Sequence, residues 1–170
     1  MGIIGVGNVG KAVAKRAAAF GMRILGSDPV LPCQQVLSST GIEMSFLLRL
    51  LEQSDFISVN CDLNWTSHHL LSDSQFESMK PQAIVINTAR GPIVDEQALV
   101  RALVTGVIGG AGIDVLGHEP LPQDSPLREM DNVLLAPHNA NSSPEAWETV
   151  HENTINNLLC ELRQRALVVA

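Results

Sequence analysis

A glycine pattern near the start of this 170-residue chain most constrains what it can fold into. Gly5, Gly7 and Gly10 form G-x-G-x-x-G where a predicted strand over residues 3–6 passes into a predicted helix over residues 11–20. In such a turn the first glycine permits the tight bend, the second lets the backbone approach a pyrophosphate, and the third lets the helix pack on the strand. Phosphates would meet the unpaired N–H groups at the start of the helix. The pattern predicts a dinucleotide site formed by Gly5, Gly7, Asn8, Val9 and Gly10.

The rest of the chain alternates short apolar, β-branched runs with stretches of helical periodicity. Runs that are apolar at nearly every position are typical of strands covered on both faces. This order predicts an α/β fold with a doubly wound parallel sheet, the Rossmann dinucleotide-binding fold, with helices on both faces. The expected strands are residues 3–6, 23–26, 56–59, 83–87, 112–115 and 133–136, and the expected helices are 11–20, 45–53, 73–79, 95–105 and about 144–163.

An acidic residue follows the second predicted strand. Asp28 lies 18 positions after Gly10, near the spacing of about 20 at which such folds place the carboxylate that accepts hydrogen bonds from the adenosine ribose. A carboxylate at this point would also repel a 2′-phosphate. We therefore expect NAD rather than NADP as the cofactor.

Three residues in the second half of the chain form a second constellation. Arg90, Glu119 and His138 each end or follow a predicted strand, so they could converge on the sheet edge that carries the glycine turn. A guanidinium offers a planar fork to a carboxylate, and a histidine can pass a proton near neutral pH. A carboxylate beside the imidazole favours its protonated form. Beside a nicotinamide, this set suits hydride transfer to or from a 2-hydroxy acid.

With these motifs in order, the chain resembles the D-isomer-specific 2-hydroxyacid dehydrogenases over almost its whole length. The resemblance implies that Arg90 binds the substrate carboxylate and carbonyl, that Glu119 orients the histidine and raises its pKa, and that His138 is the acid/base. The phosphoglycerate dehydrogenase-like and glyoxylate/hydroxypyruvate reductase-like branches are the most similar. The matching residues are 2–10, 28–29, 54–55, 79–81, 86–92, 94–95, 98–99, 112–115, 119–122, 125–127, 132–133 and 137–138.

The resemblance also implies further cofactor contacts. Asp114 is expected near the nicotinamide amide, and Thr88 and Ala89 are expected to line the cofactor cleft. The cofactor-binding set is Gly5, Gly7, Asn8, Val9, Gly10, Asp28, Cys61, Thr88, Ala89, Arg90, Asp114 and His138.

Composition excludes several classes of function. The formal charge of −7 argues against nucleic acid or an anionic membrane as the main partner. Three widely spaced cysteines without a CxxC pair suit reduced thiols, and no metal site is expected because His68, His69 and His151 lack ligands at suitable spacing. With no apolar run that approaches a membrane span, the expected location is cytoplasmic.

The expected organisation is a single NAD-binding domain over residues 1–170, with the family's substrate domain absent. The final helix is expected to start with Ser143 as its cap, and residues 166–170 look like the start of a further strand. The resemblance implies a homodimer through the coenzyme domain and a small 2-hydroxy or 2-keto acid as substrate. Two functions stay open: a dehydrogenase or its catalytic half, and an NAD(H)-binding fragment or sensor, similar to a corepressor, without turnover on its own.

Overall fold

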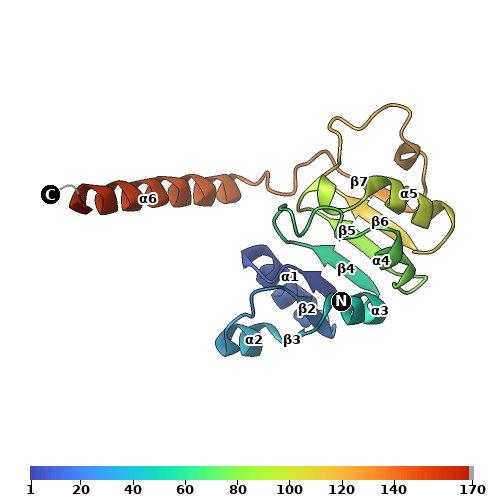
Figure 1. Cartoon of the computed structure of the whole chain (residues 1–170), viewed down its shortest axis with the longest axis horizontal. Helices are drawn as coiled ribbons and strands as arrows, with labels where there is room; N and C mark the ends of the chain where they lie inside the picture. The colour runs from blue at the N-terminus through green and yellow to red at the C-terminus, as the bar shows by residue number, and fades with distance from the viewer. Residues whose placement is uncertain (169–170) are drawn as a thin grey trace. The chain divides into compact units, whose positions relative to one another are not determined.

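The computed structural model describes residues 1–168 and contains one seven-stranded parallel sheet (Figure 1). The strand order β3-β2-β1-β4-β5-β6-β7 reverses between β1 and β4, so the sheet is doubly wound as predicted. The strands are β1 (Gly2–Ile4), β2 (Ile24–Ser27), β3 (Ile42–Met44), β4 (Phe56–Val59), β5 (Ile84–Asn87), β6 (Gly110–Ile113) and β7 (Val133–Leu135).

Helices connect successive strands. They are α1 (Asn8–Ala19), α2 (Gln34–Thr40), α3 (Leu47–Gln53), α4 (Asp73–Glu77) and α5 (Glu96–Val104), with 3₁₀ turns at Gly91–Ile93 (η1) and Pro126–Arg128 (η2). The sequence pattern did not indicate α2 or β3. Both are short, and the helix sequence QQVLSST has too few apolar residues to show a helical period.

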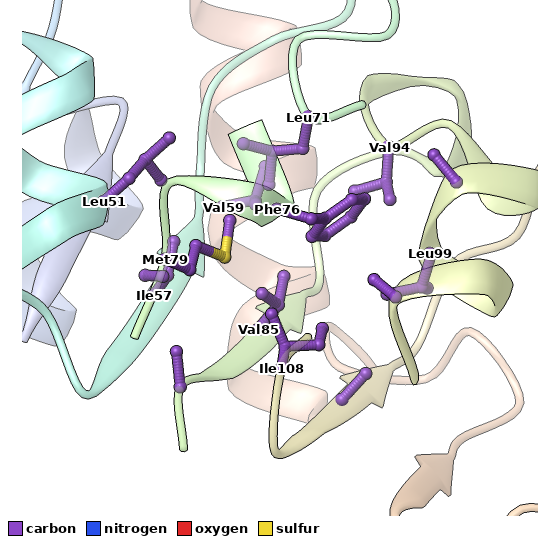
Figure 2. Packing of buried hydrophobic residues seen from close by; sticks show 14 of the residues in the cluster. Leu51, Ile57, Val59, Leu71, Phe76, Met79, Val85, Val94, Leu99 and Ile108 are labelled. Atoms are coloured by element: carbon purple, nitrogen blue, oxygen red, sulfur yellow. The ribbon is translucent and has the colours of Figure 1, made fainter. Parts of the chain in front are cut away.

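The main core lies between the sheet and helices α3, α4 and α5 (Figure 2). Phe76 of α4 is only 1% exposed and is the largest of the fully buried side chains. Val85 of β5 and Leu99 of α5 belong to the same cluster. A smaller cluster around Ile3 and Ala14 lies under α1. Burial of apolar surface on both faces of β1 explains why its sequence is apolar without alternation.

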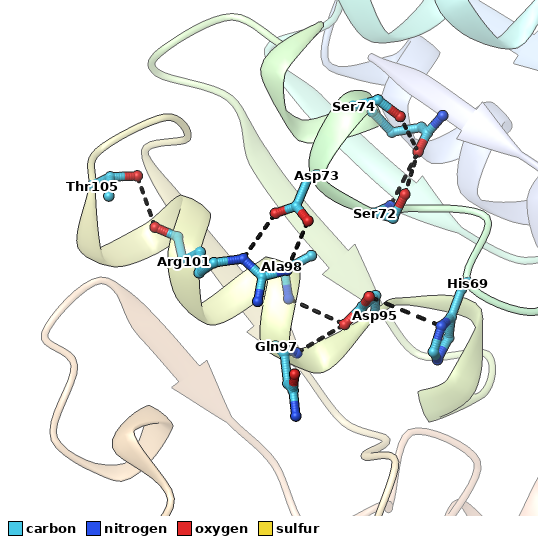
Figure 3. Close-up of polar contacts among 10 residues, drawn as sticks. His69, Ser72, Asp73, Ser74, Asp95, Gln97, Ala98, Arg101 and Thr105 are labelled. Carbon is cyan, nitrogen blue, oxygen red and sulfur yellow. Dashed lines mark hydrogen bonds and ion pairs between the residues drawn. The ribbon is translucent and has the colours of Figure 1, made fainter.

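The outer surfaces of α4 and α5 are joined by an ion pair (Figure 3). Arg101 donates from Nε and Nη2 to the two carboxylate oxygens of Asp73, at 3.0 and 2.7 Å. The hydrogen bonds from Arg101 lower the pKa of the Asp73 carboxyl below its usual value. Both side chains are about half exposed, so the pair adds little to stability.

The opposite face of the sheet is more open toward β7. Ile86, Gly112 and Leu134 are neighbours in the sheet register, so they share one face. Leu134 is 74% exposed on this edge strand, whereas Ile3 on β1 is fully buried. On the β1–β3 half of this face, Ala14 of α1 and Leu37 of α2 pack with Ile3 in the smaller cluster.

The chain divides into two compact units, Met1–Pro137 and the part that begins at His138. The second unit contains α6 (Pro144–Val168), and the hydroxyl of Ser143 accepts the N–H of Ala146 at 3.1 Å, so the expected cap is present. The helix runs past the expected end at 163. Residues 166–168 are helical, so the expected strand is wrong there, and residues 169–170 lie outside the described part.

Along α6 the apolar side chains recur at helical spacing and are exposed. They are Trp147, Val150, Ile155, Leu158, Leu159 and Leu162. No helix described between residues 1 and 168 is long and apolar enough to cross a membrane. That residues 1–170 form a single NAD-binding domain stays a prediction.

Candidate functional site at the carboxyl ends of the strands

The glycine turn connects β1 to α1, and its three glycines differ in their surroundings. Gly5 has φ +88°, and a Cβ there would lie 2.5 Å from the backbone nitrogen of Cys61. A Cβ on Gly10 would overlap the carbonyl oxygen of Gly5, which explains how α1 starts so close to the strand. A Cβ on Gly7 would meet nothing within 4 Å. The backbone at Gly7 therefore faces open space at the start of a helix, as an anion site requires.

Asp28 follows β2 and binds the glycine turn directly. Its Oδ2 accepts the N–H of Val6 at 2.7 Å, and its Oδ1 accepts the N–H of Val30 at 2.8 Å. Such bonds to a carboxylate are stronger than those between neutral groups. Asp28 therefore fixes the glycine turn as well as ending β2, a role that its spacing in the sequence did not indicate.

Two pockets lie at the carboxyl ends of the strands, one on each side of β1. One is about 590 Å³ and is lined at the ends of β4 and β5 by Val9, Val59, Asn60, Cys61, Asp62, Leu63, Thr88, Ala89 and Arg90. The other is about 540 Å³ and is lined at the ends of β2 and β3 by Ser27, Asp28, Pro29, Leu31, Met44, Ser45, Phe46, Leu47 and Arg49. The glycine turn after β1 stands between them in the strand order. Such a layout at the point where the strand order reverses is typical of dinucleotide sites.

The segment after β5 carries Arg90. Asn87, the last residue of the strand, accepts the N–H of Ala89 on Oδ1 at 3.1 Å and donates from Nδ2 to the Arg90 carbonyl at 3.0 Å. The Arg90 side chain is exposed, and its Nη1 donates to the Ala89 carbonyl at 2.6 Å. Thr88 is also exposed. The guanidinium keeps further N–H groups that could bind an anion in the pocket.

The segments of Arg90 and Glu119 meet at Leu116. A Cβ on Gly91 would overlap the carbonyl group of Leu116, and Glu119 Oε1 accepts the N–H of Leu116 at 2.9 Å. Glu119 is exposed at the surface. The fold thus brings the Arg90 and Glu119 segments together at the Leu116 backbone.

Asp114 and Cys61 are the partly hidden members of the expected cofactor set. Asp114 is 5% exposed at the end of β6, and its N–H donates to the Asn87 carbonyl at 3.0 Å. Cys61 lies in the larger pocket, and burial raises the pKa of its thiol.

His138 begins the second unit. It follows the end of β7 by three residues, is exposed, and has φ +56°, a left-handed backbone conformation. Such a conformation is uncommon outside glycine, although histidine adopts it more readily than most residues. The segments of Arg90 and Glu119 meet within the first unit, whereas His138 belongs to the second unit. A role for His138 beside them is therefore a proposal.

His69, which the sequence suggested only as a metal ligand to be rejected, holds the other side of the Arg90 segment. Its N–H donates to the Pro92 carbonyl at 2.8 Å, with φ +52°. Its Nδ1 lies 3.9 Å from Oδ2 of Asp95, the N-cap of α5 (Figure 3). His68 and His69 stack on each other with ring centroids 4.1 Å apart. Among residues 1–168 no group of three or more potential metal ligands is present.

Comparison with known proteins places these features in a family context. The family model described as "D-isomer specific 2-hydroxyacid dehydrogenase, NAD binding domain" matches residues 1–140. A glyoxylate reductase of Korarchaeum cryptofilum is 43% identical over 159 residues, which are 94% of this chain and 48% of the relative. A D-3-phosphoglycerate dehydrogenase of Methanocaldococcus jannaschii is 42% identical over 147 residues, 86% of this chain and 28% of the relative.

A solved structure of similar fold is also similar in sequence. An acyclic imino acid reductase in complex with NADPH and D-Arg superposes with a TM-score of 0.85 at 35% identity, over 96% of this chain and 50% of that protein. This chain therefore spans about half the length, or less, of the proteins it matches.

Proposed function

The chain belongs to the D-isomer specific 2-hydroxyacid dehydrogenase family, and from this premise we propose that it binds NAD(H) and serves hydride transfer between this cofactor and a small D-2-hydroxy or 2-oxo acid. The observation that carries the proposal is the pair of pockets on either side of the glycine turn, with Asp28 bound to the turn. The adenosine would occupy the pocket beside Asp28. The pyrophosphate would lie at Gly7 and the start of α1, and the nicotinamide would occupy the pocket beside Arg90.

The reaction needs a carboxylate site and a proton donor next to the reacting carbon. Arg90 would hold the substrate carboxylate with its planar fork. In the reduction, His138 would give a proton to the carbonyl oxygen, and in the oxidation it would take the hydroxyl proton. Glu119 would orient His138 and favour its protonated form. Bound NADH would supply the hydride in the reduction, and bound NAD would accept it in the oxidation.

The relatives' names support a short substrate. Glyoxylate, hydroxypyruvate and 3-phosphoglycerate each carry the carboxylate next to the reacting carbon, so each could use Arg90 in the same way. The homodimer and the cytoplasmic location expected from the sequence stay predictions.

A titration of NADH fluorescence with the purified chain tests the cofactor part of this proposal. We expect saturable binding. The catalytic part is tested by following NADH oxidation with glyoxylate or hydroxypyruvate, and NAD reduction with 3-phosphoglycerate. We expect slow turnover, because Arg90 is exposed in the described structure and would bind the substrate carboxylate in competition with water.

Variants Arg90→Ala and His138→Ala should abolish this turnover while NADH still binds. Absence of saturable NADH binding would refute the cofactor assignment. Saturable binding without turnover on any of these acids would contradict the catalytic proposal and favour an NAD(H)-binding module.

A further inference from the structure

Asn87 is a buried residue whose side-chain amide hydrogen-bonds the backbone of the Arg90 segment. It is 1% exposed at the end of β5. Its amide oxygen accepts the N–H of Ala89, and its amide nitrogen donates to the carbonyl of Arg90. The proposed function gives Asn87 no chemical role, yet few side chains could make both contacts. A carboxylate cannot donate, and a hydroxyl is shorter.

One of these two hydrogen bonds binds Ala89, whose carbonyl also accepts the Arg90 guanidinium, and the other binds the Arg90 carbonyl. The N–H of Ala89 is bound by Asn87, while the carbonyl of Ala89 accepts Nη1 of Arg90 at 2.6 Å. Ala89 is therefore held on one side by the Asn87 amide and on the other by the Arg90 side chain. A change in the amide contact would alter the peptide orientation from which the guanidinium is presented.

The far side of the segment is fixed by other contacts. The Pro92 carbonyl accepts the N–H of His69, and the Ile93 carbonyl accepts the N–H of Leu71 at 3.2 Å. Gly91 packs against the Leu116 backbone. These contacts all lie after Arg90. The Arg90 carbonyl also accepts the N–H of Ile93 at 3.3 Å. Before Arg90, Asn87 binds the N–H of Ala89.

Asn87 also connects the Arg90 segment to β6. Its carbonyl accepts the N–H of Asp114 at 3.0 Å, and Asp114 is itself buried. One residue thus binds the Arg90 turn with its side chain and the start of the Asp114 loop with its backbone.

We propose that Asn87 is a positioning residue of the carboxylate site: its side-chain amide, through the Ala89 N–H and the Arg90 carbonyl, sets the direction in which the Arg90 guanidinium meets a substrate carboxylate. The proposal rests on the function proposed above for Arg90. Residue 87 must therefore both donate and accept a hydrogen bond.

Two variants separate the two hydrogen bonds. Asn87→Asp keeps an acceptor for the Ala89 N–H but loses the donor to the Arg90 carbonyl. Asn87→Ser shortens the side chain and loses both. Thr40→Val is the control, because Thr40 is also buried at 3% exposure and hydrogen-bonded, but lies at the end of α2. Loss of stability alone would affect the control and the test variants alike.

Amide hydrogen exchange tests the positioning role without any ligand. In Asn87→Ser, exchange at Ala89 should be faster by about tenfold, the equivalent of one hydrogen bond. In Asn87→Asp and in Thr40→Val it should stay close to that of the parent chain. Unchanged exchange at Ala89 in Asn87→Ser would overturn the proposal, whether or not the chain binds a substrate.

Binding of oxamate, a carboxylate that mimics a 2-oxo acid, tests the consequence for Arg90. In the NADH-loaded chain, both Asn87 variants should bind oxamate about tenfold more weakly, while their NADH affinity stays within about twofold of the parent. In an Arg90→Ala background the Asn87 substitutions should change oxamate binding less than about twofold, because their effect passes through Arg90.

The outcomes separate the two proposals. If the parent chain fails to bind oxamate, the proposed substrate site is wrong, and the exchange rates at Ala89 still decide the role of Asn87. Parent-like oxamate affinity in Asn87→Asp would overturn the positioning role even with the substrate site intact. Equal losses in Thr40→Val would also overturn it, because they would show a general effect of stability.

Discussion

Asp28 offers the sharpest prediction, because its carboxylate binds the glycine turn and is also proposed to bind the adenosine ribose. It binds the N–H groups of Val6 and Val30 at 2.7 and 2.8 Å, and it would face the adenosine ribose in the adjoining pocket. Asp28→Asn keeps one acceptor oxygen and the shape of the side chain but removes the charge. Loss of a charge-assisted hydrogen bond costs about 1.5–3 kcal/mol, so NADH affinity should fall by roughly ten- to a hundredfold.

The same substitution should favour NADPH. A 2′-phosphate about 4 Å from the Asp28 carboxylate would experience a repulsion of up to about 4 kcal/mol at an effective dielectric constant of about 20. The neutral asparagine side chain removes this repulsion. The ratio of NADPH to NADH affinity, measured by fluorescence titration of both cofactors, should therefore rise by at least about tenfold.

A matched control is Asp55→Asn, which removes an exposed carboxylate paired with Lys80 at the amino edge of the sheet. It should leave both affinities unchanged. An unchanged cofactor ratio in Asp28→Asn would refute the assignment of the Asp28 pocket to the adenosine ribose. Parent-like NADH affinity would refute the coupling between Asp28 and the glycine turn.

Three further predictions concern the site and the core. Gly91→Ala should destabilise the chain in urea titration and change the environment of Glu119, because the added Cβ would overlap the Leu116 backbone; parent-like stability would contradict this packing. Phe76→Ala should lower the free energy of unfolding by about 3–5 kcal/mol, since the ring is fully buried; a loss below about 1 kcal/mol would argue against the described core. Burial raises the pKa of the Cys61 thiol, so its alkylation by iodoacetamide at neutral pH, followed by peptide mass spectrometry, should be slower than that of a free cysteine and should accelerate as the pH rises through the raised pKa. NADH should slow it further, and alkylation as fast as that of free cysteine would contradict the burial.

Sequence patterns predicted the elements that are strongly apolar and the glycine turn that joins two of them. β1, β4 and β5 lie close to their expected places because strands buried on both faces leave an uninterrupted apolar run. β3 was missed because it follows a short polar helix and occupies the edge of the sheet. The end of α6 was misjudged because valine and leucine near residue 167 fit a strand or a helix equally well by pattern alone.

The site was predictable as a set of residue types but not as a set of contacts. Arg90 and Glu119 were singled out by their chemistry. The side-chain amide of Asn87 and the close backbone packing of Gly91 hold these segments through contacts that no period or spacing reveals. The bond from Val6 to Asp28 is of the same kind. A positioning contact between residues far apart in the sequence is seen only once the strands are in register.

The central claim is that NAD(H) lies along the carboxyl edge of the sheet, across the glycine turn. Titration of the ¹⁵N-labelled chain with NADH, followed by amide chemical shifts, tests it most directly. The account predicts saturable shifts at Gly7, Asn8 and Val9 and at residues of both flanking pockets, including Asp28 and Thr88, with the amino edge around Arg23 and Asp55 unchanged. Shifts confined to the amino edge, or none at the glycine turn, would contradict it.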